Sequence, residues 1–537
     1  MTIASVILAA LACAELPLYI SNHDQLPLRR VVHQIVGRTN VVYDANGALE
    51  LVEGEAIAFY VKDSANVTIR NVRIDYARPC MTEARVARFD GGKTVVSIDA
   101  KRFPCVMKDG CLEMSGPGWT NAVCAARVFD GVTGVQIPGV PDIPFDGKAS
   151  LLADGTVELE KDFSGFGIGV KPGDVIVLRP RRRPYPAIFV DGSRDVVLED
   201  VVVHDACGMA LVAQRSENVL WRGTKPPGTR TSGVFPRDGC YASTHADATH
   251  FSNVKGLAAV ENCLFSGMMD DAINVHSTCL SIQKVLEQRS IRCRYMHPQA
   301  VGFDVFRPGE TLRFIRGPTL ENGPVCKVAD VVWHDAREVT LTLDSVLPDG
   351  FGEGDAVENA DWQPAVVFRG NVVCNNRARG ALFTTPHPVL VESNVFHDVT
   401  GCAILFAGDS SYWYESGACR DVAIRHNVFS NCCTAASNIG FSKGILSFYP
   451  SIRNLGSQKA FYHGGIVIED NAFYTFDVPL LFAISTENLV WRRNKVVYDG
   501  SLESWGKPPF IAIRCRDIAV DGKPVADTPP PRSCGLL

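Results

Sequence analysis

The stretch that decides the fold reads PAVVFRGNVV (364–373) and returns one repeat later as PVLVESNVF (388–396). Each copy is a short alternating strand, a polar turn centred on asparagine and a second short apolar strand. The two asparagines, Asn371 and Asn394, are 23 residues apart. Self-similarity at a period of roughly 20 to 50 residues is typical of a solenoid, in which each repeat packs against its neighbours.

The same phrase occurs along most of the chain, with longer intervals where insertions fall. Further copies are SANVTIRNV (64–72), SRDVVLEDV (193–201), DVAIRHNVF (421–429), GIVIEDNAF (465–473) and ENLVWRRNKV (487–496). A coil of about 23 residues with three short strands and no helical period predicts an all-β fold, a right-handed parallel β-helix. Asparagine suits the corners, because it tolerates the left-handed backbone conformation and can hydrogen-bond in a ladder with its neighbours.

Two long segments interrupt the repeat, and both are rich in β-formers and turn residues. We interpret them as antiparallel β-barrel or sandwich modules inserted into coil loops. Insertions of this kind map to one face of a solenoid, so we expect both modules on the same side. The predicted division is a β-helix domain of residues 15–80, 184–277 and 361–520, inserted modules of residues 81–183 and 278–360, and a proline-rich tail of residues 521–537.

Composition limits the class of partner. Hydrophobic residues make up 46% of the chain and charged residues 21%, as in an ordinary globular protein. The net charge of -6 offers no basic patch for nucleic acid, and no stretch reaches the roughly 18 apolar residues of a membrane span. The apolar segment Met1–Ala14 lacks the basic residues that begin a secretion signal, so we expect a short structural helix there. The 18 cysteines form no CxxC pair, which favours buried core thiols over zinc ligands.

The densest polar stretches in this apolar repeat are THADATHF (244–251) and GMMDDAINVH (267–276). They place Asp247 and Asp270 23 residues apart, which is one coil, and Asp271 adds a third carboxylate. We therefore expect Asp247 and Asp270 at equivalent positions on adjacent coils, whose strands lie about 4.8 Å apart.

Carboxylates held this close repel one another when ionised, so one of them should keep its proton near neutral pH. That arrangement gives a general acid beside a general base, the pair that glycoside hydrolysis needs. Two other interpretations stay open. The aspartates could cap corner turns, or a divalent ion could be coordinated by His245, Asp247, His250, Asp270 and His276.

The register of the two coils is supported by Cys240 and Cys263, which show the same 23-residue offset. Adjacent-coil stacking alone suggests carboxyl groups about 5 Å apart, the spacing of retaining glycosidases, whereas inverting enzymes need roughly 6.5–9.5 Å. Side chains that splay apart could reach the longer distance, so the sequence leaves the stereochemistry open.

A second patch, GDSSYWYESG (408–417), puts aromatic side chains beside acids, a combination that suits the apolar face and the hydroxyls of a sugar. From it we single out Trp413 and Glu415 as substrate-binding candidates, although a packed loop covering the helix would have the same composition. Nearer the aspartates, the substrate-binding candidates are His245, Asn274, His276 and Arg379.

At these residues the sequence resembles glycoside hydrolase family 110, the α-1,3-galactosidases. The matching phrases are YISNHDQ at Tyr19, ADATHF at Ala246, MMDDAINVH at Met268 and WYESGA at Trp413. Together with the repeats between them, the resemblance covers most of the chain. The chain differs from the family at its amino end, where the segment before YISNHDQ is short.

The resemblance implies removal of terminal α-1,3-linked galactose with inversion, without a metal or an organic cofactor. The implied partner is a galactose-terminated glycan or glycoconjugate, of blood-group-B type or linear, and a homo-oligomer is compatible with it. Asp270 looks like the general acid, and Asp247 and Asp271 look like the carboxylates that activate water. Such a substrate implies a secreted or periplasmic protein, although the amino terminus is not a convincing signal.

Two further classes of function remain as alternatives. Another β-helix enzyme, a polygalacturonase-like hydrolase or a polysaccharide lyase, would share the fold. A lyase usually needs basic residues and often calcium, and the acidic cluster has no run of Lys or Arg beside it in the sequence, which disfavours it. A non-catalytic glycan-binding solenoid would need exposed aromatic residues but not stacked carboxylates.

Overall fold

The computed structural model describes residues 18–28, 30–435 and 443–528. Within them the fold is all-β, as predicted, and the two helical elements are single 3-10 turns at Pro227–Thr229 and Leu455–Ser457. No helix in this part of the chain is long and apolar enough to cross a membrane. The short helix expected at Met1–Ala14 lies outside the described residues.

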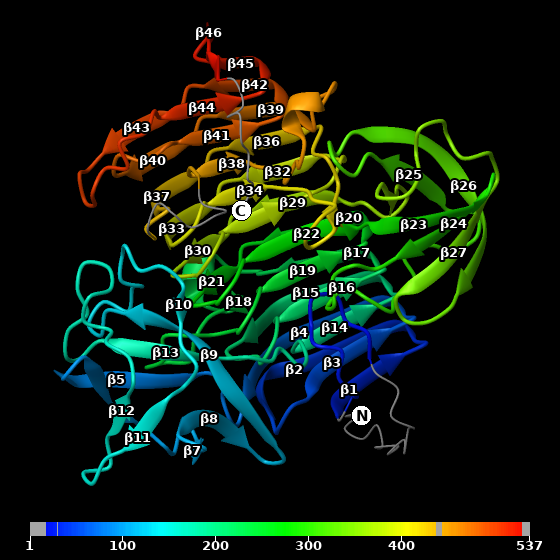
Figure 1. Ribbon diagram of the computed structural model, residues 1–537. Coiled ribbons are helices and arrows are strands. Elements are labelled where there is room, and N and C mark those ends of the chain that lie inside the picture. Colours follow the sequence, from blue (N-terminus) through cyan, green and yellow to red (C-terminus); the bar gives the residue numbers. More distant parts are fainter. Residues whose placement is uncertain (1–17, 29, 436–442, 529–537) are drawn as a thin grey trace.

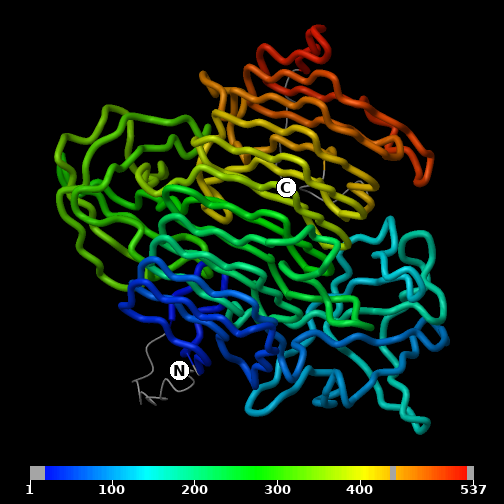
Figure 2. Tube along the Cα trace, turned by 180° about the vertical axis from the view of Figure 1, so that it is seen from behind, coloured from blue at the N-terminus to red at the C-terminus, as the bar shows by residue number. Residues whose placement is uncertain are grey.

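One coil illustrates the repeat. It consists of β29 (Ala365–Arg369), β30 (Val372–Cys374) and β31 (Ala381–Phe383), and each strand pairs in parallel with its counterpart on the next coil. Val366 lies opposite Val389, which is the 23-residue register that the sequence predicts. The predicted parallel β-helix is therefore confirmed, with three strands per coil. Figures 1 and 2 show the coils stacked from β1 (Val31–Val36) at one end to β45 (Arg516–Val520) at the other.

The sheet that matters for the site is the 13-stranded one. Its parallel strands are β1, β3 (Ile57–Lys62), β14 (Ile188–Asp191), β16 (Leu211–Gln214), β19 (Thr249–Ser252), β22 (Ile273–Thr278), β31, β34 (Ile404–Phe406), β38 (Leu446–Phe448), β41 (Leu481–Ile484), β44 (Phe510–Ile513) and β47 (Asp527–Thr528). Side chains alternate across a strand, so Ile273 and Val275 enter the main hydrophobic core while Asn274 and His276 face outward. Polar groups of adjacent coils thereby gather on the outer face of this sheet.

An asparagine ladder closes one corner of the helix. Its members are Asn371, Asn394, Asn427, Asn471 and Asn494. Along this ladder, each backbone amide donates to the side-chain oxygen of the next asparagine at 2.9 Å. The predicted ladder is present, but the expected backbone conformation is displaced by one residue. The left-handed conformation, with φ from 55° to 67°, belongs to the residue before each asparagine: Gly370, Ser393, His426, Asp470 and Arg493. The asparagine side chain is therefore free to hydrogen-bond with the asparagines of the adjacent coils.

Replacing Asn427 with alanine should destabilise the protein by about 2–4 kcal/mol, because each buried polar group left without a partner costs about 1–3 kcal/mol. Asn427 is 1% exposed, accepts from the backbone amide and the side chain of Asn394, and donates to the carbonyl oxygen of Val391. The measurement is the denaturant midpoint, with the exposed Asn322 changed to alanine as the control. Equal midpoints for the two variants would show that the ladder contributes nothing.

The two insertions fold as antiparallel β modules, as predicted. The second is a closed barrel of β23 (Leu280–Glu287), β24 (Ser290–Arg294), β27 (Glu338–Leu343), β26 (Asn322–Trp333), β25 (Thr311–Ile315) and β28 (Ala356–Asn359). The first is a nine-stranded sheet running from β5 (Thr82–Asp90) to β13 (Val175–Pro180) in the chain. The prediction of a shared face is wrong, because in both views the modules flank the coil stack on opposite sides (Figures 1 and 2).

Candidate active site

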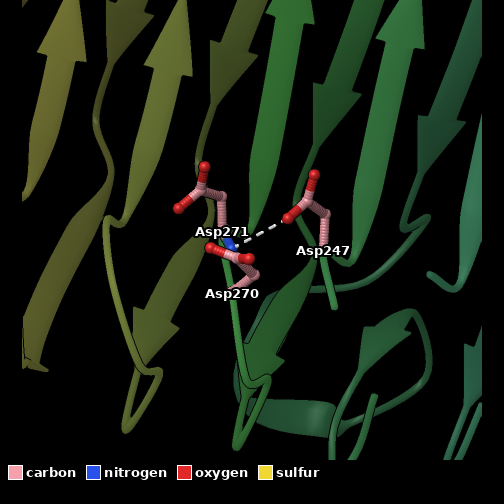
Figure 3. Close-up of side chains that lie close together, drawn as sticks. All are labelled: Asp247, Asp270 and Asp271. Carbon is pink, nitrogen blue, oxygen red and sulfur yellow. Dashed lines mark hydrogen bonds between the residues drawn. The ribbon is translucent and has the colours of Figure 1, made fainter. Parts of the chain in front are cut away.

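The three aspartates sit where the chain enters two neighbouring strands of the 13-stranded sheet. Asp247 precedes β19, and Asp270 and Asp271 precede β22 on the next coil. One carboxylate oxygen from each lies within 4.8 Å of the others. Figure 3 shows Asp247 facing the other two from the adjacent coil, while Asp270 and Asp271 turn their carboxylates in different directions. The structure thus brings the predicted cluster together.

The predicted register of the cluster is wrong by one residue. Thr249 lies opposite Ile273, an offset of 24 positions, so Asp247 stands opposite Asp271 and not Asp270. The extra residue is a β-bulge at the start of β20 (Lys255–Glu261), where the register against β17 (Glu217–Arg222) shifts. Gly256 supplies the left-handed conformation there, with φ of +70°.

The cysteines used to support that register are not equivalent either. Leu264 of β21 (Leu264–Ser266) pairs with Gly233, which aligns Cys263 with Ser232 rather than with Cys240. The sulfur of Cys263 lies 3.4 Å from the Ser232 hydroxyl, inside the helix. The loop that precedes the site lengthens this coil, so the shared 23-residue offset of the cysteines is a coincidence.

Asp247 and Asp271 are buried and tightly held. Asp247 Oδ1 accepts the backbone amide of Asp271 at 3.2 Å, and its Oδ2 lies 2.8 Å from His250 Nδ1. Asp271 accepts both the backbone amide of Arg379, at 3.0 Å, and the Arg379 guanidinium, at 2.8 Å. Burial and then the charge of Asp270 raise the pKa of Asp247 well above its ordinary value, and burial raises the pKa of Asp271 despite the guanidinium.

Asp270 is the member of the cluster that reaches solvent, with 20% of its side chain exposed. Two guanidinium groups face it, Arg377 at 3.6 Å and Arg379 at 3.9 Å. Arg377 in turn forms a two-pronged ion pair with Asp142 from the first inserted module. An arginine–carboxylate network therefore surrounds the exposed aspartate.

Sequence reasoning missed Arg377 and Asp142. The signal for Arg377 was available, because counting the register across the second insertion aligns Arg379 with Asp271 and puts Arg377 in the same turn. No comparable signal existed for Asp142, which reaches the site from an inserted module. These arginines also remove one premise used against a lyase, namely that the acidic cluster lacks basic neighbours.

The other candidates fall into two groups. His276 joins the site through hydrogen bonds that run from Asp247 by way of His250. Glu415 lies beside it, accepting from Asn22 and 3.6 Å from His276 Nε2. Asn274 lies beside His250 across β19 and β22, and its buried side-chain oxygen has no hydrogen-bond partner among the described residues. His245 is also buried beside the site, with Nδ1 unpartnered in the same part of the chain.

Trp413 is held against the second inserted module. Its ring packs on His297 of the second module, with ring centroids 4.0 Å apart, and its backbone amide donates to Asp409. This packing fits a covering loop and a sugar-binding aromatic equally, so substrate binding by Trp413 stays a prediction, whereas its neighbour Glu415 reaches the site. The short strand β35 (Glu415–Ser416) adds antiparallel to the end of β22 and places that carboxylate.

The proposed mixed histidine and aspartate metal set is not assembled. Among the described residues, the one group of three acidic, histidine or cysteine side chains close enough to share an ion is Asp247, Asp270 and Asp271. His250 and His276 instead face each other at 3.0 Å. Arg379 already places positive charge against two of the three carboxylates.

Clustered carboxylates are the groups that glycoside hydrolysis needs, so this β-helix and its site have the form expected of a β-helix glycoside hydrolase. The chain is 45% identical over 520 residues to an alpha-1,3-galactosidase B of Akkermansia muciniphila, covering 96% of this chain and 64% of that protein. It is 35% identical over 518 residues to an alpha-1,3-galactosidase B of Bacteroides fragilis, covering 94% of this chain and 86% of that protein. The chain belongs to the alpha-1,3-galactosidase B family.

Two further comparisons concern parts of the architecture. Residues 290–357, within the closed barrel, match the family described as GLAA-B beta-barrel domain II. Among solved structures, a family 28 exopolygalacturonase of Yersinia enterocolitica is similar with a TM-score of 0.33 at 12% identity, covering 89% of this chain and 74% of that one. A structure titled glycoside hydrolase has a TM-score of 0.35 at 8% identity, covering 90% and 89%. Likeness at this level says nothing about activity.

Proposed function

We propose that the protein is an exo-acting α-1,3-galactosidase of glycoside hydrolase family 110. It removes terminal α-1,3-linked galactose, with inversion, from blood-group-B-type or linear Gal-α-1,3-Gal glycans. The observation that carries the proposal is the approach of three carboxylates to within 4.8 Å in a chain of this family. No metal or organic cofactor enters the proposed reaction. Because such glycans are extracellular, we place the protein in the periplasm or outside the cell, which fractionation of the producing cells would test.

In the proposed reaction, Asp270 donates a proton to the glycosidic oxygen, which suits the one carboxyl of the three that reaches solvent. As it gives up the proton, Arg377 and Arg379 stabilise the carboxylate that forms. Asp247 or Asp271 accepts a proton from the water that attacks the anomeric carbon from the opposite face. The bond to the departing sugar breaks, and β-galactose leaves.

The spacing of the carboxylates makes stereochemistry the decisive measurement. Their oxygens approach to within 4.8 Å. The carboxyl groups of inverting enzymes are usually about 6.5–9.5 Å apart. Inversion is therefore supported by the family resemblance and not by this distance.

Proton NMR of a fresh Gal-α-1,3-Gal digest should show β-galactose first, with the α-anomer appearing only by mutarotation. The α-anomer appearing first would overturn inversion while keeping the linkage. An unsaturated product absorbing in the ultraviolet would establish a lyase. Binding of the glycan without any release over long incubation would establish a binding solenoid.

A further inference from the structure

A line of hydrogen-bonding groups runs from Asp247 away from the other two carboxylates. Asp247 Oδ2 lies 2.8 Å from His250 Nδ1, and His250 Nε2 lies 3.0 Å from His276 Nε2. His276 Nδ1 lies 3.1 Å from the carbonyl oxygen of Ser277, and its Nε2 lies 3.6 Å from Glu415 Oε1. Both imidazoles are fully enclosed, so these partners replace water.

The partners restrict where the hydrogens can lie. A carbonyl oxygen only accepts, so His276 donates from Nδ1 to Ser277. Burial lowers the pKa of His250 to about 3, so this ring is neutral and carries a single hydrogen at neutral pH. The contact between the two Nε2 atoms also needs one hydrogen. If the hydrogen belongs to His276 Nε2, His276 carries hydrogens on both nitrogens and is a cation. His250 then has its single hydrogen on Nδ1 and donates it to Asp247, which is ionised. If the hydrogen belongs to His250 Nε2, His250 Nδ1 has none and can only accept. Asp247 must then be protonated to donate to it.

Two groups favour the arrangement in which Asp247 is ionised. The Glu415 carboxylate faces His276 Nε2 and stabilises a cation there. Asn22 Nδ2 donates to Glu415 Oε1 at 2.9 Å and lies 3.4 Å from His250 Nε2, so it presents a hydrogen to that nitrogen. Burial acts to raise the pKa of Glu415, but the charge of His276, the hydrogen bond from Asn22 and the charge of Arg379 act the other way, and the pKa lies below its ordinary value.

We propose that His250, His276 and Glu415 form a relay that offsets the burial of Asp247 and the nearby charge of Asp270 and so keeps Asp247 ionised. The relay thereby makes Asp247, rather than Asp271, the base that activates water. The inference rests on the proposed galactosidase function. The three relay residues are positioning residues, because they act through Asp247. Asp271 differs because its two oxygens are taken up by Arg379, which fixes it as a structural anion of the site.

The two arrangements contain the same number of protons. One proton moves from His276 Nε2 to His250 Nε2 while another moves from His250 Nδ1 to Asp247 Oδ2. The total charge of the chain is unchanged, and only the place of the charges differs. Glu415, at the far end, therefore controls the charge of Asp247 through the two rings.

Other charged groups act on the relay from the surrounding elements. Asp270, Arg379 and Arg183 act on Asp247; His23, Arg183 and Asp270 act on His250; His297, Asp409 and Arg379 act on Glu415. None of them is altered in the variants below. Their contributions therefore cancel when each variant is compared with the wild type.

The pH profile of Glu415→Gln separates the relay from simple electrostatics. Removing a negative charge should by itself lower the pKa of Asp247 and move the acidic limb of kcat/KM to lower pH. The relay predicts the opposite, because without Glu415 the proton moves from His276 to Asp247. We expect the acidic limb to rise by about one pH unit or more, each unit being a tenfold change in the ionised fraction.

His276→Gln should move the acidic limb in the same direction, and His397→Gln is the matched control. His397 also pairs with an acid, Asp398 at 2.9 Å, but lies on the other sheet of the coil. An unmoved limb or a limb at lower pH in Glu415→Gln would overturn the relay.

Chemical rescue identifies the base independently. Azide needs no base, so it should restore turnover in Asp247→Ala and give β-galactosyl azide, with the Asp270 proton passing to the departing sugar. Rescue of Asp271→Ala instead, with none for Asp247→Ala, would overturn the assignment.

A readout without substrate keeps the relay distinct from the proposed function. Nitrogen-15 NMR of histidine-labelled protein should show His276 carrying both hydrogens at pH 7, and one in Glu415→Gln. A neutral His276 in the wild type would overturn the relay. Failure of the wild type to cleave Gal-α-1,3-Gal would overturn the proposed function while leaving this measurement intact.

Discussion

Changing Asp270 to asparagine should lower kcat on Gal-α-1,3-Gal by about 100- to 10,000-fold, the range over which a positioned general acid acts. Asparagine keeps the size of the side chain and its contact with Arg377 and Arg379 but has no acidic proton. The side chain is partly exposed, so the fold should survive the change. Circular dichroism and the melting temperature check that point.

The leaving group of the substrate tests the role of Asp270 directly. The dinitrophenolate of a dinitrophenyl α-galactoside leaves without being protonated. Asp270→Asn should therefore lose far less activity on this substrate than on the disaccharide. Equal losses on both substrates would show that Asp270 is not the acid. Asp154→Asn, an exposed acid of the first inserted module, is the control and should leave both activities unchanged.

Changing Arg379 to methionine should destabilise the protein by about 3–5 kcal/mol, the usual cost of removing one partner of a buried ion pair. Asp271 has none of its side chain exposed, and the Arg379 guanidinium is the cation that it contacts at 2.8 Å. Methionine fills most of the space but leaves the carboxylate without that charge. Activity should fall as well, because Asp270 loses one of its two cations. Thermal or denaturant unfolding measures the first effect.

The double variant Arg379→Met with Asp271→Asn separates charge from packing. In the single variant the Asp271 carboxylate has lost its cation. Replacing that carboxylate with a neutral amide should recover most of the stability and none of the activity. If stability does not recover, lost packing and not an uncompensated charge explains the single variant. Arg493→Met removes an arginine from exposed ion pairs with Asp470 and Glu469 and should leave the unfolding midpoint almost unchanged.

The fold could be predicted from the sequence because the β-helix coils repeat at a regular interval. The asparagines at 23-residue intervals mark one corner of successive coils, and Asn371 and Asn394 occupy that corner as expected. The pairing register of residues within a single coil could not be predicted from the sequence. One extra residue at Gly256 shifts the partner of Asp247 from Asp270 to Asp271, and a bulge leaves no trace in a list of intervals.

The carboxylates of the candidate site could be predicted, but their surroundings could only be predicted in part. Acidic residues in an apolar repeat are conspicuous, and strand pairing brings them together. Arg377 follows from the register once the second insertion is subtracted. Asp142 does not, because its position depends on how a separate module docks against the coils. The packing of Trp413 on His297 depends on such docking too.

The place of the site within the stack has a consequence for its local dynamics. Within the part of the chain that the structure describes, β19, β22 and β31 are the fifth, sixth and seventh of the twelve parallel strands in their sheet. In a solenoid each coil is stabilised only by its neighbours, so opening begins at the ends and must travel inward. The backbone amides around Asp247 and Asp271 are therefore among the last of the described coils to exchange with solvent, and opening of the outermost described coils leaves the carboxylates in place.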